Sequence, residues 1–184
     1  LAYGEEGPLS HLPGYEPLMQ AHGGILSYTG EAGGPPVRVG TSVVDMGTGV
    51  WTALGILAAL RERDRTGEGS RVSGALFDTA LMWSGYHLLG AHGQGVVAGR
   101  MGTELPMIAP YGVFEASDGP VMIAVGNDRL FGAFCRALEL EDLLADPRFA
   151  TGPSRVVHRE ALNPRIREAV ARRSVRDVLR RLEA

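Results

Sequence analysis

Asp45 is the residue whose type and setting point most directly to chemistry. It follows the strand-like pair Val43–Val44 at the start of a helical pattern, and Gly47 and Gly49 come shortly after it. One interpretation is a helix N-cap, whose carboxylate accepts hydrogen bonds from free backbone N–H groups. The other is a carboxylate that points into a cleft as a nucleophile or a base. A helix N-terminus favours negative charge, and glycines let a substrate approach the backbone closely. The local sequence leaves both open.

The other reactive side chains predict no metal site and no tightly bound cofactor. Gly47-Thr48-Gly49 lacks the third glycine of a dinucleotide fingerprint, and the chain has no lysine for a P-loop or a Schiff base. Cys135 lies on an apolar helix face, where a buried and inert thiol is expected. No histidines are spaced as a ligand pair, so we expect packing or surface roles for His11, His22, His87, His92 and His158. Tyr15 and Glu16 follow a Pro-Gly turn and predict only a turn with an aromatic anchor.

Composition excludes several classes of protein. The 184 residues are 45% hydrophobic and 21% charged, which predicts a folded core rather than disorder. A net charge of −3 gives no reason to expect a nucleic-acid partner. Charged residues interrupt the apolar runs before the roughly 18 residues of a membrane span, so no membrane partner is expected. With one cysteine and no secretory signal pattern, the chain is expected to be cytoplasmic.

The elements that must position these residues alternate between helix and strand. We expect a helix over 16–26, a short strand at 37–39 and a long apolar helix from Asp45 to Thr66–Gly67. A strand at 70–76 and a helix over 79–90, capped by Asp78, complete a helix–strand–helix unit. The glycine-rich stretch 90–102 predicts a linker or domain crossing.

The second half begins with a hairpin signal. Strands at 109–115 and 121–125 flank an Asp-Gly turn. Asn127 or Asp128 is then expected to cap a helix, and the remainder of the chain is expected to be helical.

Read together, these blocks resemble the family III CoA-transferases, the group of formyl-CoA and carnitine CoA-transferases. The matching stretches are GPLSHLPGYEPLMQAHGGILSYTGE, VGTSVVDMGTGVWTALGILAALRERDRTGEGSRV, ALFDTAL, IAPYGVFEASDGPVMIAVGNDRLFGAFC and DPRFAT. Their order matches that of the family across nearly the whole chain.

The resemblance implies a role for Asp45. In this family the corresponding Asp attacks an acyl-CoA thioester, giving a mixed anhydride, then an aspartyl-CoA thioester, then a second anhydride with the acceptor acid. Coenzyme A is therefore expected as substrate and product. The oxyanion at each step needs preorganised N–H donors, which Gly47 and Gly49 could expose as they shape the pocket.

The resemblance also gives weight to Tyr15 and Glu16, which align with a Tyr-Glu pair of the formyl-CoA enzymes thirty residues before the nucleophile. They are expected to position substrate or CoA carbonyls. The related α-methylacyl-CoA racemases carry His where this chain has Tyr15, so a transferase is preferred to a racemase or isomerase. A non-catalytic CoA-binding relative is the third alternative.

The implied fold class is α/β. Residues 1–98 would be part of an open Rossmann-like large domain, and 99–184 a smaller α+β domain. Family members are about twice this length and form interlocked dimers, so a homodimer is expected. Met101–Pro106 holds one glycine where the formyl-CoA enzymes have four, which points to another acyl pair.

Overall fold

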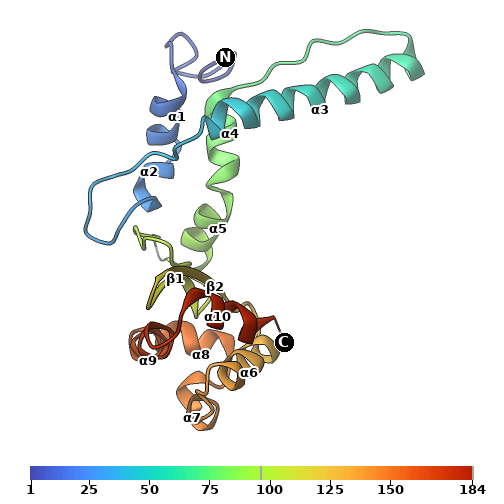
Figure 1. The fold of residues 1–184 in the computed structure, drawn as a ribbon. Helices are drawn as coiled ribbons and strands as arrows, with labels where there is room; N and C mark the ends of the chain where they lie inside the picture. The colour runs from blue at the N-terminus through green and yellow to red at the C-terminus, as the bar shows by residue number, and fades with distance from the viewer. Residues whose placement is uncertain (96, 184) are drawn as a thin grey trace. The chain divides into compact units, whose positions relative to one another are not determined.

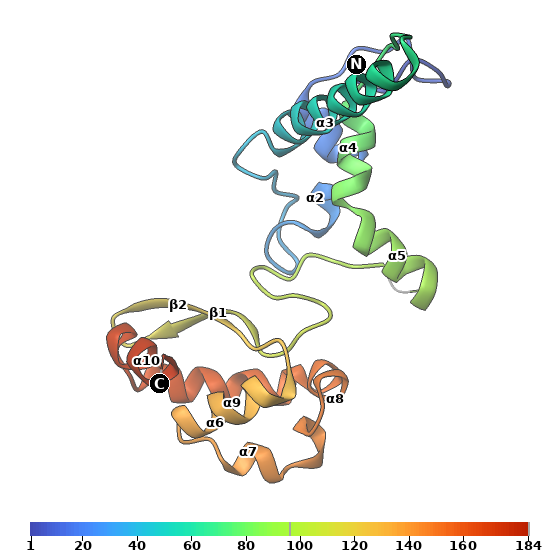
Figure 2. The same ribbon diagram turned by 90° about the vertical axis from the view of Figure 1, so that its right-hand side faces the viewer.

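The chain forms two compact units, Leu1–Arg100 (unit 1) and Met101–Ala184 (unit 2). The computed structural model describes residues 1–95 and 97–183. The division lies two residues after the predicted boundary. Figures 1 and 2 show both units as ribbons, and each is described here by itself.

All the secondary-structure elements that the structure describes in unit 1 are helices, joined by long irregular segments. Its helices are α1 (Glu16–His22), α2 (Ile25–Tyr28), α3 (Val43–Thr66), α4 (Leu76–Trp83) and α5 (Gly85–Gln94). A small core joins α1, α2, α3 and α4 through Met19, Ile25, Val44 and Ala80. The strands expected at 37–39 and 70–76 are wrong, because these extended segments have no strand partner among the described residues.

The first helical stretch is divided by its glycines. α1 ends at His22, and Gly24 has a φ of +85°, a left-handed conformation that favours glycine. The single helix expected over 16–26 is therefore two short ones.

The long helix α3 starts earlier than expected. Val43 and Val44 are its first two residues rather than the end of a strand. Its C-terminus is as predicted: Gly67 adopts a φ of +77° and its N–H donates to the carbonyl oxygen of Arg63. The chain then runs back along α3, as Figure 1 shows, and passes so close that a Cβ on Gly55 would lie 2.9 Å from Val72.

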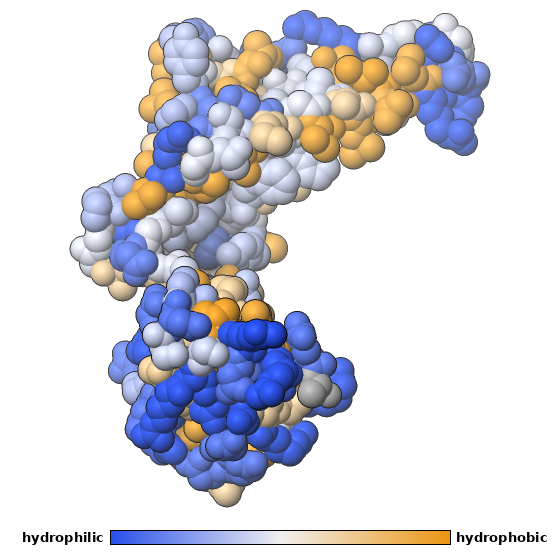
Figure 3. All heavy atoms as spheres, in the orientation of Figure 1, coloured by the Kyte–Doolittle hydropathy of each residue, from blue (hydrophilic) through white to orange (hydrophobic). Residues whose placement is uncertain are grey.

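Much of α3 is exposed and apolar. Figure 3 shows orange, hydrophobic atoms along this helix; among its exposed side chains are Met46, Val50, Trp51, Leu54 and Leu57. By length and composition alone α3 could cross a membrane, with an 18-residue window of mean hydropathy 1.6. The expectation that charges interrupt every such run is wrong, because Asp45 is the only charged residue among residues 43–60. One helix of this kind is weak evidence for a membrane span.

The second half of unit 1 contains two helices rather than one. α4 and α5 meet at Ser84, whose hydroxyl donates to the carbonyl oxygens of Gly23 and Ala80. Asp78 does not cap a helix: it lies inside the first turn of α4, whose N-cap is Ala75.

Unit 2 packs helices against one hairpin. Strands β1 (Tyr111–Ala116) and β2 (Gly119–Ala124) pair antiparallel, as expected. The Oδ1 of Asn127 accepts from the N–H of Leu130 at 2.9 Å, which confirms the predicted cap of α6. The helices are α6 (Asp128–Ala137), α7 (Asp142–Ala145), α8 (Gly152–Val157), α9 (Arg159–Ala171) and α10 (Val175–Leu182), with a 3-10 turn at Pro147–Phe149. Helices together with a small sheet make the chain mixed α/β.

A buried arginine ties the core of unit 2 together. Arg155 is 1% exposed, and its guanidinium donates to the carbonyl oxygens of Ala109 and Phe149 and to Asp128 at 2.7 Å. It also lies over the ring of Phe131 at 4.3 Å from the centroid. One side chain therefore joins the segment just before β1, the start of α6 and the 3-10 turn.

Candidate active site

Asp45 is an exposed carboxylate in the first turn of α3. The N-cap interpretation is wrong, because Ser42 occupies that position and Asp45 is the third residue of the helix. Among the described residues its side chain has no hydrogen bond or ion pair. Its carboxylate is left free to react, at a helix end where backbone partial charges favour an anion.

Glu16 lies beside this turn, in the opposite environment. It is 4% exposed, and its Oε1 accepts from the Val44 N–H at 3.4 Å, a long hydrogen bond. Val44 directly precedes Asp45, so the structure brings two of the predicted site residues together at the N-terminus of α3. The second carboxylate oxygen, Oε2, is buried without a partner in the part of the chain that the structure describes.

Tyr15 presents its ring to solvent. It is the N-cap of α1 and 83% exposed, and its carbonyl oxygen accepts from the N–H groups of Leu18 and Met19. The backbone of Tyr15 therefore anchors α1, while the phenol remains available to a ligand.

The two glycines after Asp45 have different surroundings. Gly47 is buried against α4: a Cβ there would lie 2.8 Å from the Trp83 ring and 2.9 Å from the Thr79 methyl group. A Cβ on Gly49 would meet nothing within 4 Å. Gly47 therefore shapes the contact between α3 and α4.

The N–H groups of these glycines do not offer an oxyanion hole. Both residues lie inside α3, where backbone N–H groups bond to the carbonyl four residues earlier. In the first turn, the Val43 N–H donates to Thr41 and the Val44 N–H to Glu16. The Asp45 N–H is the first-turn donor without a partner within residues 1–95.

Sequence reasoning missed Gln20, a residue of α1 whose side chain is fully buried against the chain that leads into α3. Its Nε2 donates to Glu16 Oε1 at 2.6 Å, and its Oε1 accepts from the Val39 N–H at 2.8 Å. The Glu16–Gln20 spacing of four residues, which places both on one helix face, was the available signal.

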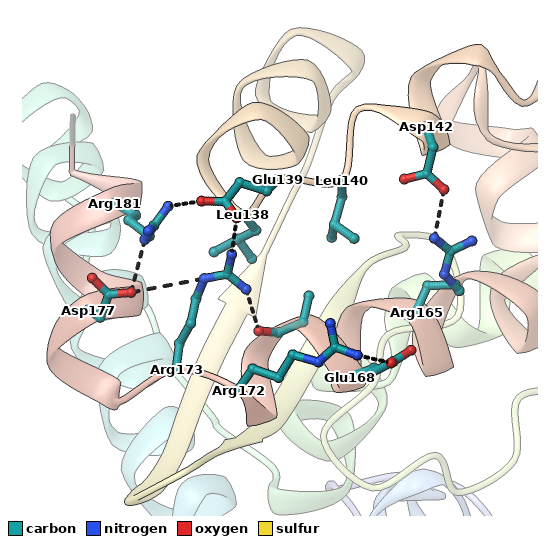
Figure 4. A pocket seen from close by; sticks show the side chains of 11 residues that line it. Leu138, Glu139, Leu140, Asp142, Arg165, Glu168, Arg172, Arg173, Asp177 and Arg181 are labelled. Carbon is teal, nitrogen blue, oxygen red and sulfur yellow. Dashed lines mark hydrogen bonds and ion pairs between the residues drawn. The ribbon is translucent and has the colours of Figure 1, made fainter.

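A polar cavity of about 530 Å³ lies in unit 2 and is lined by none of the predicted site residues. Figure 4 shows its arginines facing carboxylates: Arg165 pairs with Asp142, Arg172 with Glu168, and Arg173 and Arg181 with Glu139. Hydrogen bonds from Arg180 and Arg181 hold the pKa of Asp177 below its usual value. Because the arginines and carboxylates that line it are paired with one another, the cavity offers no unpaired charge to a ligand.

The structure gives no reason to place a metal in either unit. Across residues 1–95 and 97–183, no three His, Cys, Asp or Glu side chains lie where they could hold one ion together.

An α/β fold in two units with an exposed carboxylate at the start of a helix does not by itself define a class of protein. Comparison with known proteins is more specific. The family model for CoA-transferase family III matches residues 1–184. The chain belongs to CoA-transferase family III.

Curated relatives agree. The chain is 38% identical over 171 residues to an acetyl-CoA:oxalate CoA-transferase from Acetobacter aceti, which covers 92% of this chain and 44% of the relative. It is 33% identical over 177 residues to a succinate–glutarate CoA-transferase from Agrobacterium fabrum, covering 96% and 44%. The chain thus spans less than half the length of these relatives.

Solved structures show the same fold. A CAIB/BAIF family protein from Brucella suis matches with a TM-score of 0.78 and 35% identity, over 99% of this chain and 48% of that one. Rv3272 from M. tuberculosis matches with a TM-score of 0.84 and 25% identity, over 99% and 47%.

Proposed function

We propose that the protein to which these residues belong transfers CoA from an acyl-CoA to a carboxylic acid, with Asp45 as the nucleophile. The observation that carries the proposal is the exposed Asp45 carboxylate, free of side-chain partners, in the first turn of α3 and next to the Val44–Glu16 contact. A carboxylate is already ionised at neutral pH in its ordinary state, so it attacks without a general base.

The proposed reaction exchanges partners at one carboxylate. An oxygen of Asp45 attacks the thioester carbonyl, the C–S bond breaks, and CoA leaves as a thiolate from a mixed anhydride. The thiolate attacks the Asp45 carbonyl carbon and releases the donor acid, which leaves an aspartyl-CoA thioester. The acceptor carboxylate then displaces CoA from Asp45, and the thiolate attacks the acceptor acyl carbon, which regenerates Asp45. The sequence needs no net proton transfer and no redox partner.

The neighbouring residues have supporting roles in this proposal. Tyr15 extends its phenol into solvent and would donate a hydrogen bond to a substrate carbonyl. Glu16 is buried, so it would act by holding the Val44 N–H and with it the first turn of α3. The Asp45 N–H is a candidate donor to the oxyanion.

Short dicarboxylic acids are the first acceptors to test. Relatives at 32–38% identity carry names that include oxalate, mesaconate, glutarate and citramalate. The proposed substrates are therefore an acyl-CoA donor and a small dicarboxylic acid.

Trapping the intermediate tests the chemistry. The whole protein is mixed with a panel of acyl-CoAs, quenched with hydroxylamine and digested, and the peptides are analysed by mass spectrometry. A hydroxamate on the Asp45 peptide supports the proposal. Exchange of the α-proton of a 2-methylacyl-CoA without any adduct would favour a racemase, and CoA binding without either signal would indicate a non-catalytic relative.

Two matched variants sharpen this test. Asp45→Asn should abolish both the adduct and turnover while leaving the melting temperature within a few degrees, because the side chain has no partner to lose. Asp64→Asn changes a carboxylate that is 69% exposed near the other end of α3 and should leave turnover unchanged. Normal transfer by Asp45→Asn would contradict the assignment.

We also propose that the whole protein forms a homodimer. The exposed apolar face of α3 supports association, because contiguous apolar surface of this extent is usually covered in solution. Sedimentation of the whole protein tests it, and a monomer at micromolar concentration would count against it.

A further inference from the structure

Gln20 makes a set of buried contacts that the proposed chemistry does not yet use. Its side-chain amide is 0% exposed, and it lies between Glu16, one turn earlier on α1, and Val39, in the chain that leads into α3. Besides the bonds to Glu16 and the Val39 N–H, its Nε2 lies 3.5 Å from the Val39 carbonyl oxygen.

The surroundings fix which way the amide points. Its Oε1 faces the Val39 N–H, which can only donate, and its Nε2 faces a carboxylate and a carbonyl, which accept. The reversed amide would set acceptor against acceptor, so this orientation is the one that satisfies all the groups. The Gln20 amide thus faces both the N–H and the carbonyl oxygen of Val39, as the backbone of a neighbouring β-strand would.

These contacts hold the chain on both sides of the turn into α3. We call residues 39–42 the lead-in segment. Gln20 accepts a hydrogen bond from Val39, the first residue of the lead-in segment. It also donates to Glu16 Oε1, the oxygen that accepts from the N–H of Val44, two residues after the segment ends. The N-cap residue Ser42 adds no side-chain hydrogen bond of its own.

One further contact holds the same helix end from the other side. The indole N–H of Trp83 in α4 donates to the Val43 carbonyl oxygen at 3.3 Å. The first turn of α3 is therefore fixed between α1 and α4, and the α1 side depends on the Gln20–Glu16 pair.

We propose that Gln20 is a positioning residue for Asp45: its buried amide fixes Glu16 and the lead-in segment, and so sets the direction in which the first turn of α3 presents the carboxylate. The inference rests on the proposed function, since it concerns the approach of Asp45 to a thioester. Small misplacements of a reacting group cost up to about a hundredfold in rate.

The test is single-turnover trapping on Asp45 in the whole protein. Gln20→Met keeps the length of the side chain but removes its hydrogen bonds. It should slow formation of the Asp45 adduct by about ten- to a hundredfold and leave the KM for acyl-CoA within about twofold. Met19→Ala is the control. Met19 is as fully buried on α1 as Gln20 is, and it packs in the core of unit 1, but its side chain makes no hydrogen bond to Glu16 or Val39.

Gln20→Glu tests the orientation of the amide. A carboxylate at position 20 still accepts from the Val39 N–H, but it sets an acceptor against Glu16 Oε1 and against the Val39 carbonyl oxygen. Gln20→Glu should therefore slow formation of the Asp45 adduct at least as much as Gln20→Met does, while the KM for acyl-CoA again stays within about twofold.

The outcomes separate the two proposals. If the wild-type protein forms no Asp45 adduct, the proposed function fails and this inference with it. If the wild type is trapped and Gln20→Met is trapped no more slowly than Met19→Ala, the positioning role alone is overturned. Trapping of Gln20→Glu at the wild-type rate would overturn it as well.

Discussion

Glu16 shows how the environment can separate two carboxylates near one helix end. Asp45 is exposed and free, whereas Glu16 is buried and accepts from both Gln20 and Val44. A buried acceptor shared by two donors is costly to remove, because both donors are then left unsatisfied. Glu16 is therefore a buried support for the first turn of α3, and the proposed chemistry belongs to the exposed Asp45.

Variants at Glu16 should distinguish the contribution of its acceptor oxygen to stability from the contribution of its negative charge. Glu16→Ala removes the acceptor and should lower the free energy of unfolding by about 1–3 kcal/mol. Glu16→Gln keeps an acceptor oxygen in place and exchanges only the unpartnered Oε2, so it should cost less than half as much. Urea denaturation of both variants gives the comparison, and equal losses would contradict the assignment of Oε1 as the shared acceptor.

At the scale of elements, α3 packs on α4 because Gly47 has no side chain. Thr48 strengthens the same contact by donating to Thr79 Oγ1 at 2.8 Å. The neighbouring Gly49 has open space around it. Two glycines two residues apart thus have different physical reasons to be where they are.

Alanine substitutions should reveal this difference. Gly47→Ala places a methyl group under 3 Å from Trp83 and Thr79 and should destabilise the protein by about 1–3 kcal/mol. Gly49→Ala adds the same methyl group in open space and should stabilise the helix by up to about 1 kcal/mol. Thermal melting measures both, and similar shifts for the two variants would mean that α3 and α4 do not pack as described.

The burial of Cys135, the only cysteine of the sequence, within α6 predicts how its thiol reacts. Burial raises the pKa of the Cys135 thiol to about 12. The thiolate fraction at pH 8 is then about one in ten thousand, so iodoacetamide should leave Cys135 unmodified until unit 2 unfolds. Peptide mass spectrometry in rising urea follows this, and rapid labelling in buffer alone would contradict the burial.

The same shift has a consequence for stability at high pH. A folded pKa above the unfolded one means that the folded state holds the proton more tightly. The contribution of Cys135 to stability is therefore fully present below about pH 9 and declines as the pH rises towards 12.

At the scale of the whole molecule, each unit has a core of its own. Unit 2 buries a large cluster around Phe114, Phe131, Leu162 and Ile166, and unit 1 buries a much smaller one around Met19. Unit 1 also leaves apolar side chains along α3 exposed.

Arg155 should be the most sensitive charged residue of unit 2. Arg155→Met removes its bonds to two carbonyl oxygens and to Asp128, and should cost about 2–4 kcal/mol. Arg165→Met removes an exposed pair with Asp142 and should cost under about 1 kcal/mol. Hydrogen exchange should show the loss of protection in residues 101–183; an equal loss for both variants would contradict the central place of Arg155.

The sequence by itself determined the features that depend on local chemistry. Asp-Gly between apolar runs predicted the hairpin, Asn127 the start of α6, and Gly67 the end of α3, because turns and caps are set by a few adjacent residues. The order of motifs identified the family, and with it Asp45, Tyr15 and Glu16 as the residues to examine.

Only the tertiary structure decided what those residues contact. Val43–Val44 looks like a strand yet begins a helix, since Val44 is buried in the core of unit 1 while its N–H is held by a carboxylate 28 residues away. Long-range packing also places Gly47, which the sequence suggested could face a substrate, against α4. It places the buried side chain of Gln20 between Glu16 and Val39. Contacts between residues distant in the chain leave no mark on local spacing, so the fold alone could reveal them.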